Sequence, residues 1–212
     1  MINSVNTNPA MLWRSVNGQT SKSQTANTAF GQSVSNGFHA GQLNGDALVS
    51  QSIRMSGNNW LTASIFKADD FSTDNPVMRV VGTDVCGTLF EKFVNISNVD
   101  PRSASFVEML ALDGYNAANG KQVGSFARAA AAGMQSQNIA NGGNGENWGE
   151  SITAFSRLNM LAPVIHLMQL QQQHGNFDAF MHLQNITDAM NKQNETASAV
   201  GKEQKPKDRN RV

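Results

Sequence analysis

A turn between two β-prone runs, followed by a helical pattern, is the feature that most constrains the fold of this chain. Residues 77–81 read Val-Met-Arg-Val-Val, and residues 88–96 read Thr-Leu-Phe-Glu-Lys-Phe-Val-Asn-Ile. Branched and aromatic side chains of this kind favour strands. Gly82 and Gly87 lie between the two runs and tolerate the positive φ of a tight turn. The stretch therefore predicts an antiparallel β-hairpin.

The second run and the residues after it carry two further signals. Its alternation slips at Phe93 and Val94, which predicts either a β-bulge or a strand buried on both faces. Asp100 and Pro101 then suit a helix start, because aspartate accepts hydrogen bonds from free amides and proline has no amide to leave unpaired. Apolar residues recur at helical spacing after them, so we expect a helix over residues 101–119.

Three more helices are expected towards the C-terminus. Residues 121–139 carry an apolar stripe rich in alanine, and Gly124 and Gly133 predict the close approach of another helix. A third helix is expected from about residue 150 to residue 173, with Pro163 as a kink or break. Apolar residues between Phe177 and Met190 define a fourth, amphipathic helix.

These elements together predict an α+β fold, in which a small antiparallel β-hairpin or sheet is packed by about four helices. Charged residues make up only 15% of the chain, whereas an average globular domain has about 25%. We expect residues 1–52 to be a disordered polar arm, because they carry three charged side chains and scattered apolar ones. We expect residues 53–192 to form a single α+β domain, in which residues 53–75 are a transitional stretch with one short element. Residues 193–212 are expected to be a disordered, weakly basic tail.

Charge and hydropathy narrow the classes of partner. The formal net charge is zero, so no overall field attracts nucleic acid or an anionic membrane. The most apolar window, residues 158–170, is too short and too polar to span a bilayer. We expect no membrane insertion and no cleaved Sec signal peptide. A single cysteine fits both a cytoplasmic protein and one exported without a cleaved signal peptide.

The sequence contains no recognisable catalytic or metal-binding pattern. His166, His174 and His182 are spaced by eight residues, but Gly175 separates the two helices expected to carry them. No nearby carboxylate or thiol completes a ligand set. The only cysteine, Cys86, falls at the predicted hairpin loop, without a neighbouring cation to activate it. We therefore assign no catalytic, cofactor-binding or metal-ligating residues and expect no cofactor.

Two stretches resemble known proteins. The block from Asn75 to Asp84, continued from Val99 to Leu112, resembles a segment of an uncharacterised protein family of Gram-positive anaerobic bacteria. That family has no established activity to carry over to any residue here. The start, Met1 to Pro9, is similar in composition to the starts of substrates exported uncleaved by flagellar or related secretion systems. This second resemblance implies a location only.

Two functional hypotheses follow from these observations. In the preferred one, the chain is a non-enzymatic bacterial protein-protein interaction or structural protein, with its partner and its oligomeric state left open. The apolar island Met11, Leu12 and Trp13 is then the candidate partner-binding site. In the alternative, an enzyme or small-ligand-binding module assembles its site from scattered polar residues. The candidates for that site are Asp84, Glu108, Tyr115 and His166.

Overall fold

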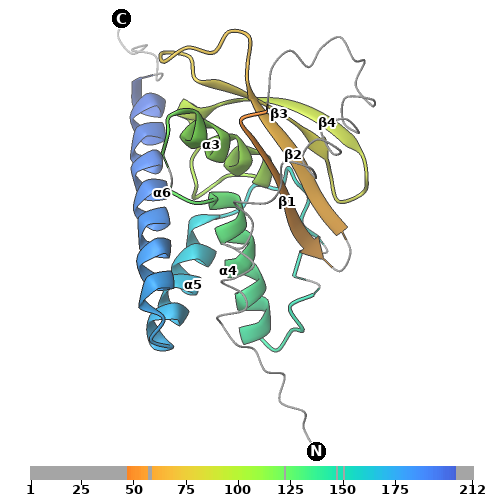
Figure 1. Cartoon of the computed structure of the whole chain (residues 1–212), viewed down its shortest axis with the longest axis vertical. Helices are drawn as coiled ribbons and strands as arrows, with labels where there is room; N and C mark the ends of the chain where they lie inside the picture. Colours follow the sequence, from red (N-terminus) through yellow and green to blue (C-terminus); the bar gives the residue numbers. More distant parts are fainter. Residues whose placement is uncertain (1–46, 57–58, 122, 147, 150, 204–212) are drawn as a thin grey trace, which may run out of the picture.

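The computed structural model confirms the α+β fold. A four-stranded antiparallel sheet with the order β1-β2-β3-β4 packs against α3 and α4, and α5 and α6 pack on these helices and on each other. Figure 1 shows the sheet at the upper right, with α4 and α5 below it and α6 along the left side. The structure describes residues 47–56, 59–121, 123–146, 148–149 and 151–203.

Each strand pairs with the strand next to it in sequence, so the sheet is a simple meander. The elements in chain order are β1 (Val49–Ser56), β2 (Asn59–Lys67), β3 (Val77–Thr83), β4 (Leu89–Asn95), the 3-10 helix η1 (Ile96–Asn98), α3 (Phe106–Ala118), α4 (Phe126–Ala140), α5 (Leu161–Gln173) and α6 (Phe177–Glu203).

The sheet is larger than the predicted hairpin, because β1 and β2 form a second one. Strand β1 begins at Val49, so residues 49–52 belong to the sheet and not to the polar arm. The transitional stretch 53–75 holds the rest of β1 and all of β2. Strand β1 was not predicted because one of its inward positions is polar. Gln51 lies on the side that faces the core, together with Ile53 and Met55, where a hydrophobic residue is normally expected.

The β3–β4 hairpin is confirmed, but the bulge predicted at Phe93 and Val94 is wrong. The strands stay in register from the pair Thr83–Leu89 to the pair Val77–Asn95. Phe93 and Val94 are both apolar because they face opposite sides: Val94 is buried and Phe93 is exposed. A strand buried on both faces, the other predicted possibility, is therefore wrong as well.

Helix α3 begins later than predicted, and its cap is Ser105 instead of Asp100. The Ser105 hydroxyl accepts a hydrogen bond from the Glu108 amide, while the Glu108 carboxylate accepts one from the Ser105 amide. This reciprocal capping box satisfies two donors at the helix start. The Asp100 carboxylate instead accepts from the Arg102 amide within a turn that precedes the helix.

Helix α5 is also shorter than the predicted helix, and Pro163 lies at its start instead of kinking it. The Asn159 side chain accepts from the amides of Leu161 and Ala162. Pro163 then occupies the first turn, where a missing amide costs nothing. Residues 151–160 are not helical; within them, Leu158 forms an isolated antiparallel bridge with Ala104.

The other two helices differ from their predictions mainly at the ends. Helix α4 starts at Phe126 instead of residue 121, because Ser125 caps it and Gly124 has a φ of 91°. Helix α6 continues to Glu203, so residues 193–203 are helical and not part of a disordered tail. The Gln193 amide donates to the carbonyls of Ile96 (2.7 Å) and Val99 (3.2 Å), which ties α6 to η1. Residues 1–46 and 204–212 lie outside the described residues.

Close helix contacts form where small residues predicted them. A Cβ at Gly133 of α4 would lie 2.1 Å from the Pro163 carbonyl oxygen of α5, so only glycine permits this approach. Gly114 likewise permits the close approach of α3 to the sheet, since a Cβ there would lie 2.3 Å from Ile65 of β2. The predicted close approach of another helix is confirmed at Gly133. It is also found at Gly124, which lies before α4, because a Cβ there would lie 2.7 Å from the His182 Nε2 of α6.

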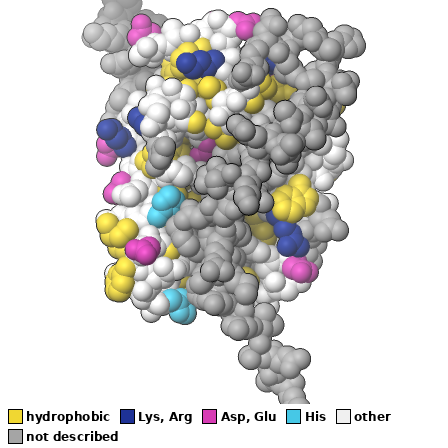
Figure 2. Space-filling view, in the orientation of Figure 1, with side chains coloured by type: hydrophobic (Ala, Val, Ile, Leu, Met, Phe, Trp, Pro, Cys, Tyr) yellow, Lys and Arg dark blue, Asp and Glu magenta, His cyan; other side chains and the backbone are white. Residues whose placement is uncertain are grey.

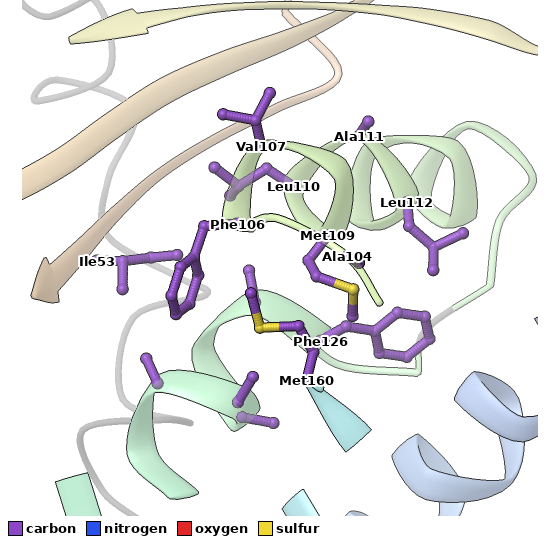
Figure 3. Packing of buried hydrophobic residues seen from close by; sticks show 14 of the residues in the cluster. Ile53, Ala104, Phe106, Val107, Met109, Leu110, Ala111, Leu112, Phe126 and Met160 are labelled. Carbon is purple, nitrogen blue, oxygen red and sulfur yellow. The ribbon is translucent and has the colours of Figure 1, made fainter. Parts of the chain in front are cut away.

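The hydrophobic core lies between the sheet and the helices. In Figure 3, Phe106 of α3 points towards Ile53 of β1, and Met109 and Met160 lie close to Phe126. All of these side chains are almost completely buried. Helix α3 contacts each strand of the sheet, so its apolar side chains join the two layers.

We expect Phe106→Ala to lower the free energy of unfolding by about 3–5 kcal/mol, the usual cost of truncating a buried phenylalanine. Phe106 is 0% exposed and packs against Trp148, with ring centroids 6.2 Å apart. Urea unfolding of the wild-type protein and of the Phe106→Ala variant measures this loss. Phe177→Ala is the matched control, because Phe177 is 67% exposed, and should change stability by no more than about 0.5 kcal/mol. Equal effects of the two variants would contradict the described core.

We expect Ser105→Ala to destabilise the chain by about 1 kcal/mol, through loss of the cap of α3. The comparison is Asp100→Ala, which removes only a turn hydrogen bond to Arg102 and should cost less. Denaturant midpoints of the two variants distinguish the observed cap from the one that the sequence suggested. A larger effect at Asp100 than at Ser105 would place the helix start at the earlier residue.

Candidate functional site

The turn between β3 and β4 determines where the last strand of the sheet begins. The Asp84 carboxylate accepts hydrogen bonds from the amides of Cys86 (2.9 Å) and Thr88 (2.8 Å). Gly87 has a φ of 79°, a conformation that glycine adopts without strain. Aspartate and glycine thus build the turn together, and β4 returns along β3 in one fixed register.

Strand β4 is an edge strand that exposes apolar side chains. It ends the strand order, and no described strand pairs with its outer edge. Phe90 and Val94 point into the core, whereas Leu89 and Phe93 on the opposite face are 42% and 61% exposed. We use the name β4 surface for the outward side chains of Leu89, Glu91 and Phe93 together with the outer backbone edge of β4. This surface offers apolar area together with outer backbone groups that pair with no other strand in the described part of the chain.

An ion pair neutralises the charge within the β4 surface. The Nε of Arg79 lies 2.7 Å from a carboxylate oxygen of Glu91. Arg79 pairs in register with Phe66 on one side and Phe93 on the other, and its guanidinium lies 5.5 Å from the Phe66 ring centre. The guanidinium is largely buried, so the glutamate is held in place beside the two exposed apolar side chains.

The remaining charge on β4 belongs to the other face of the sheet. The ammonium of Lys92 lies 5.6 Å from the centre of the Phe155 ring, and Phe90 contacts the same ring edge-on with centroids 5.2 Å apart. Lys92 therefore covers the core side at this end of the sheet. The outward face of β4 is left with an apolar–ion pair–apolar pattern.

The opposite edge of the sheet is less suitable for pairing. The register between β1 and β2 shifts between Arg54 and Ser56, and irregularities of this kind twist an edge. Helix α4 also contacts β1. The regular edge with exposed apolar side chains is therefore β4.

A second pair of exposed apolar side chains lies at the start of α6. Phe177 and Met181 are 67% and 54% exposed, and their spacing of four residues puts them on one face of the helix. Figure 2 shows hydrophobic side chains grouped at the lower left of the molecule, where α6 begins in Figure 1. Beyond the first turn, helix backbone groups are paired internally, so this face offers no continuous row of backbone groups such as a strand edge provides.

The scattered polar residues of the alternative hypothesis are not brought together by any hydrogen bond or ion pair among the described residues. Asp84 holds the hairpin turn. Glu108 caps α3 and binds Arg157 at 2.9 Å. The Tyr115 ring lies 6.4 Å from that of Phe71. The Nε2 of His166 is buried and has no hydrogen-bond partner within the described part of the chain.

The other candidate groups have the following positions. Cys86 is an exposed free thiol at the hairpin tip, as predicted. Burial lowers the pKa of His182 below its ordinary value. No group of three or more histidine, cysteine or acidic side chains is placed to hold a metal within the described ranges.

The helices that the structure describes include none that is both long and apolar enough to cross a membrane. Met11, Leu12 and Trp13 lie outside the described residues.

The sequence located β4 but could not show which of its side chains face outward. Leu89 and Phe93 form one alternating apolar set, and Phe90 and Val94 form another. Either set satisfies the pattern of a half-buried strand. Only the packing of α3 and of Phe155 against one face decides between them.

Comparison with known proteins identifies no relative. No protein-family model matches the chain, and neither a curated protein nor a solved structure is significantly similar to it.

We expect Cys86 to react with a thiol reagent such as DTNB in the folded protein about as quickly as it does in the urea-unfolded chain. Its side chain is exposed, and access and thiolate fraction control this reaction. We also expect Cys86→Ser to leave the thermal unfolding midpoint unchanged. A thiol that reacts only after denaturation would show that the hairpin tip is covered.

Proposed function

We propose that this chain is a non-enzymatic bacterial protein-interaction module, and that it binds an extended segment of a partner protein along β4. The observation that carries the proposal is the exposure of Leu89 and Phe93 on a regular edge strand. An added strand would use the outer backbone groups of β4 for affinity and its outward side chains for specificity. The face at the start of α6 has no strand edge, so it cannot form the backbone hydrogen bonds of an added strand.

The chemistry of the β4 surface specifies the kind of segment that it suits. Leu89 and Phe93 lie four positions apart along the strand, with Glu91 midway between them. Residues directly opposite in a paired strand face the same side. The partner segment should therefore carry two apolar side chains four residues apart, with a polar or basic residue midway.

Charged residues on edge strands also oppose pairing with another strand. Glu91 is such a residue on β4. Its charge is offset by Arg79 at 2.7 Å, so it opposes an incoming strand less than an unpaired charge would. Met11, Leu12 and Trp13 remain a second candidate contact with a partner, outside the described residues. The proposal holds for a cytoplasmic protein and for one exported without a cleaved Sec signal peptide.

The proposal is tested by photo-crosslinking in cells that produce the protein. A photo-reactive phenylalanine analogue at position 93 should give a discrete adduct with one protein, whereas the same analogue at position 177 should not. Phe177 is the matched control because its exposure, 67%, is similar to the 61% of Phe93. Mass spectrometry of the adduct identifies the partner.

We expect Phe93→Glu to reduce copurification of that partner at least tenfold, because a charge would replace an exposed apolar anchor. Phe177→Glu should leave copurification unchanged. Circular dichroism and the unfolding midpoint should show that both variants remain folded. Equal loss in the two variants, or an adduct that forms only at position 177, would contradict binding along β4.

A further inference from the structure

A ring of polar side chains lies at the point where β1, α3 and α4 meet (Figure 1). It consists of Gln51 on β1, Asp113 on α3 and Ser125, the cap of α4. The Asp113 carboxyl is 2.6 Å from the Ser125 hydroxyl and 3.1 Å from the Gln51 amide nitrogen, and the hydroxyl is 2.7 Å from the Gln51 amide oxygen. Asp113 is only 5% exposed. We call these three side chains the Asp113 ring.

Counting protons shows which form of Asp113 closes the ring. Three contacts within hydrogen-bond distance need three protons, one for each. The Ser125 hydroxyl supplies one, and the Gln51 amide supplies one. An ionised carboxylate supplies none, so one of the short contacts would then bring two acceptors together. A protonated Asp113 donates to Ser125, Ser125 donates to Gln51, and Gln51 donates back to Asp113.

This count does not depend on how the Gln51 amide is oriented. If the amide is turned over, its nitrogen donates to Ser125 and its oxygen faces Asp113. The contact between two oxygens at Asp113 then needs a proton from the carboxyl, as before. Both orientations therefore require the acid form of Asp113 for a complete ring.

The other carboxyl oxygen of Asp113 accepts a hydrogen bond from the Phe126 amide at 2.7 Å, at the first residue of α4. Burial raises the pKa of Asp113 from 3.8 to about 6, and the hydrogen bonds from Ser125, Phe126 and Gln51 only partly offset this effect. A carboxyl shifted in this way titrates between the pH of an acidic compartment and neutral pH.

Arg128 in the first turn of α4 is the charged group that faces Asp113. Its pKa is lowered, chiefly because its guanidinium is buried, and the negative charge of Asp113 partly opposes this change. The described residues form no ion pair between the two, and the Arg128 Nε has no hydrogen-bond partner among them. From α6, His182 packs against Gly124 beside the ring, and burial lowers its pKa.

We propose that the Asp113 ring is a proton-dependent lock: the protonated carboxyl closes the ring and holds β1 and the start of α4 against α3, and loss of the proton releases one of its hydrogen bonds. The folded chain binds this proton more tightly than the unfolded chain does. The ring's contribution to stability is therefore complete below about pH 4 and is lost as the pH rises through about 6. The lock works independently of the β4 surface.

The matched variants are Asp113→Asn, which keeps the shape and stays neutral, and Asp188→Asn, which changes an exposed carboxylate on α6. Urea unfolding of the full chain is measured at pH 4.5 and pH 7.5. Between pH 4.5 and pH 7.5, the unfolding equilibrium constant of the wild-type protein should rise roughly 25-fold relative to that of Asp113→Asn. This factor follows from linkage, because the pKa of Asp113 is 3.8 in the unfolded chain and about 6 in the folded one. Asp188→Asn should follow the unchanged chain. Equal pH dependence in all three proteins would overturn the proposal.

Two further measurements apply even if Asp113→Asn does not fold. The carboxyl carbon of Asp113, followed by NMR in the unchanged chain, should titrate near pH 6, and a midpoint below pH 4 would refute the lock. Hydrogen exchange of the backbone amides of β1, which the closed ring holds against α3, should be less protected at pH 7.5 than at pH 5 after correction for intrinsic rates. Unchanged protection would show that Asp113 titrates without acting as a lock.

Discussion

The packing of α3 across the inner face of the sheet is the interaction on which the rest of the fold depends. This helix contacts every strand as well as α4 and η1. Its close approach is possible because Gly114 leaves room for Ile65 of β2. The Ser105–Glu108 capping box fixes where the helix begins, and Arg157 binds the same glutamate from the segment that precedes α5. Both layers of the molecule are therefore arranged around one helix of 13 residues.

Local sequence signals were sufficient for the elements that depend on neighbouring residues. The hairpin of β3 and β4 could be predicted because Asp84 and Gly87 form the turn by themselves. The existence of all four described helices followed from apolar periodicity. The first residues of the helices were harder to predict, because more than one residue can serve as a cap. For α3, Asp100 and Ser105 are both suitable caps, and the Ala104–Leu158 bridge favours Ser105. That bridge joins residues far apart in sequence.

Residues that act across the fold were less accessible from the sequence. Gln51 made β1 look like part of a polar arm, although its inward amide meets Asp113 from a helix 62 positions later. Asp113 itself lies among apolar residues of α3 without any motif around it. The direction of Phe93 depends on which face of β4 receives Phe155. In each case the deciding partner is distant in sequence, and a single sequence without homologues does not reveal such pairs.

The single cysteine gives this molecule a natural attachment point for a reporter group. Cys86 is exposed at the tip of the hairpin, three positions before β4 begins. No other cysteine competes for a label anywhere in the chain. A maleimide fluorophore attached there would stand at one end of the edge strand while leaving every side chain of β4 native. Changes in its anisotropy would then follow events along that strand without any substitution in the protein.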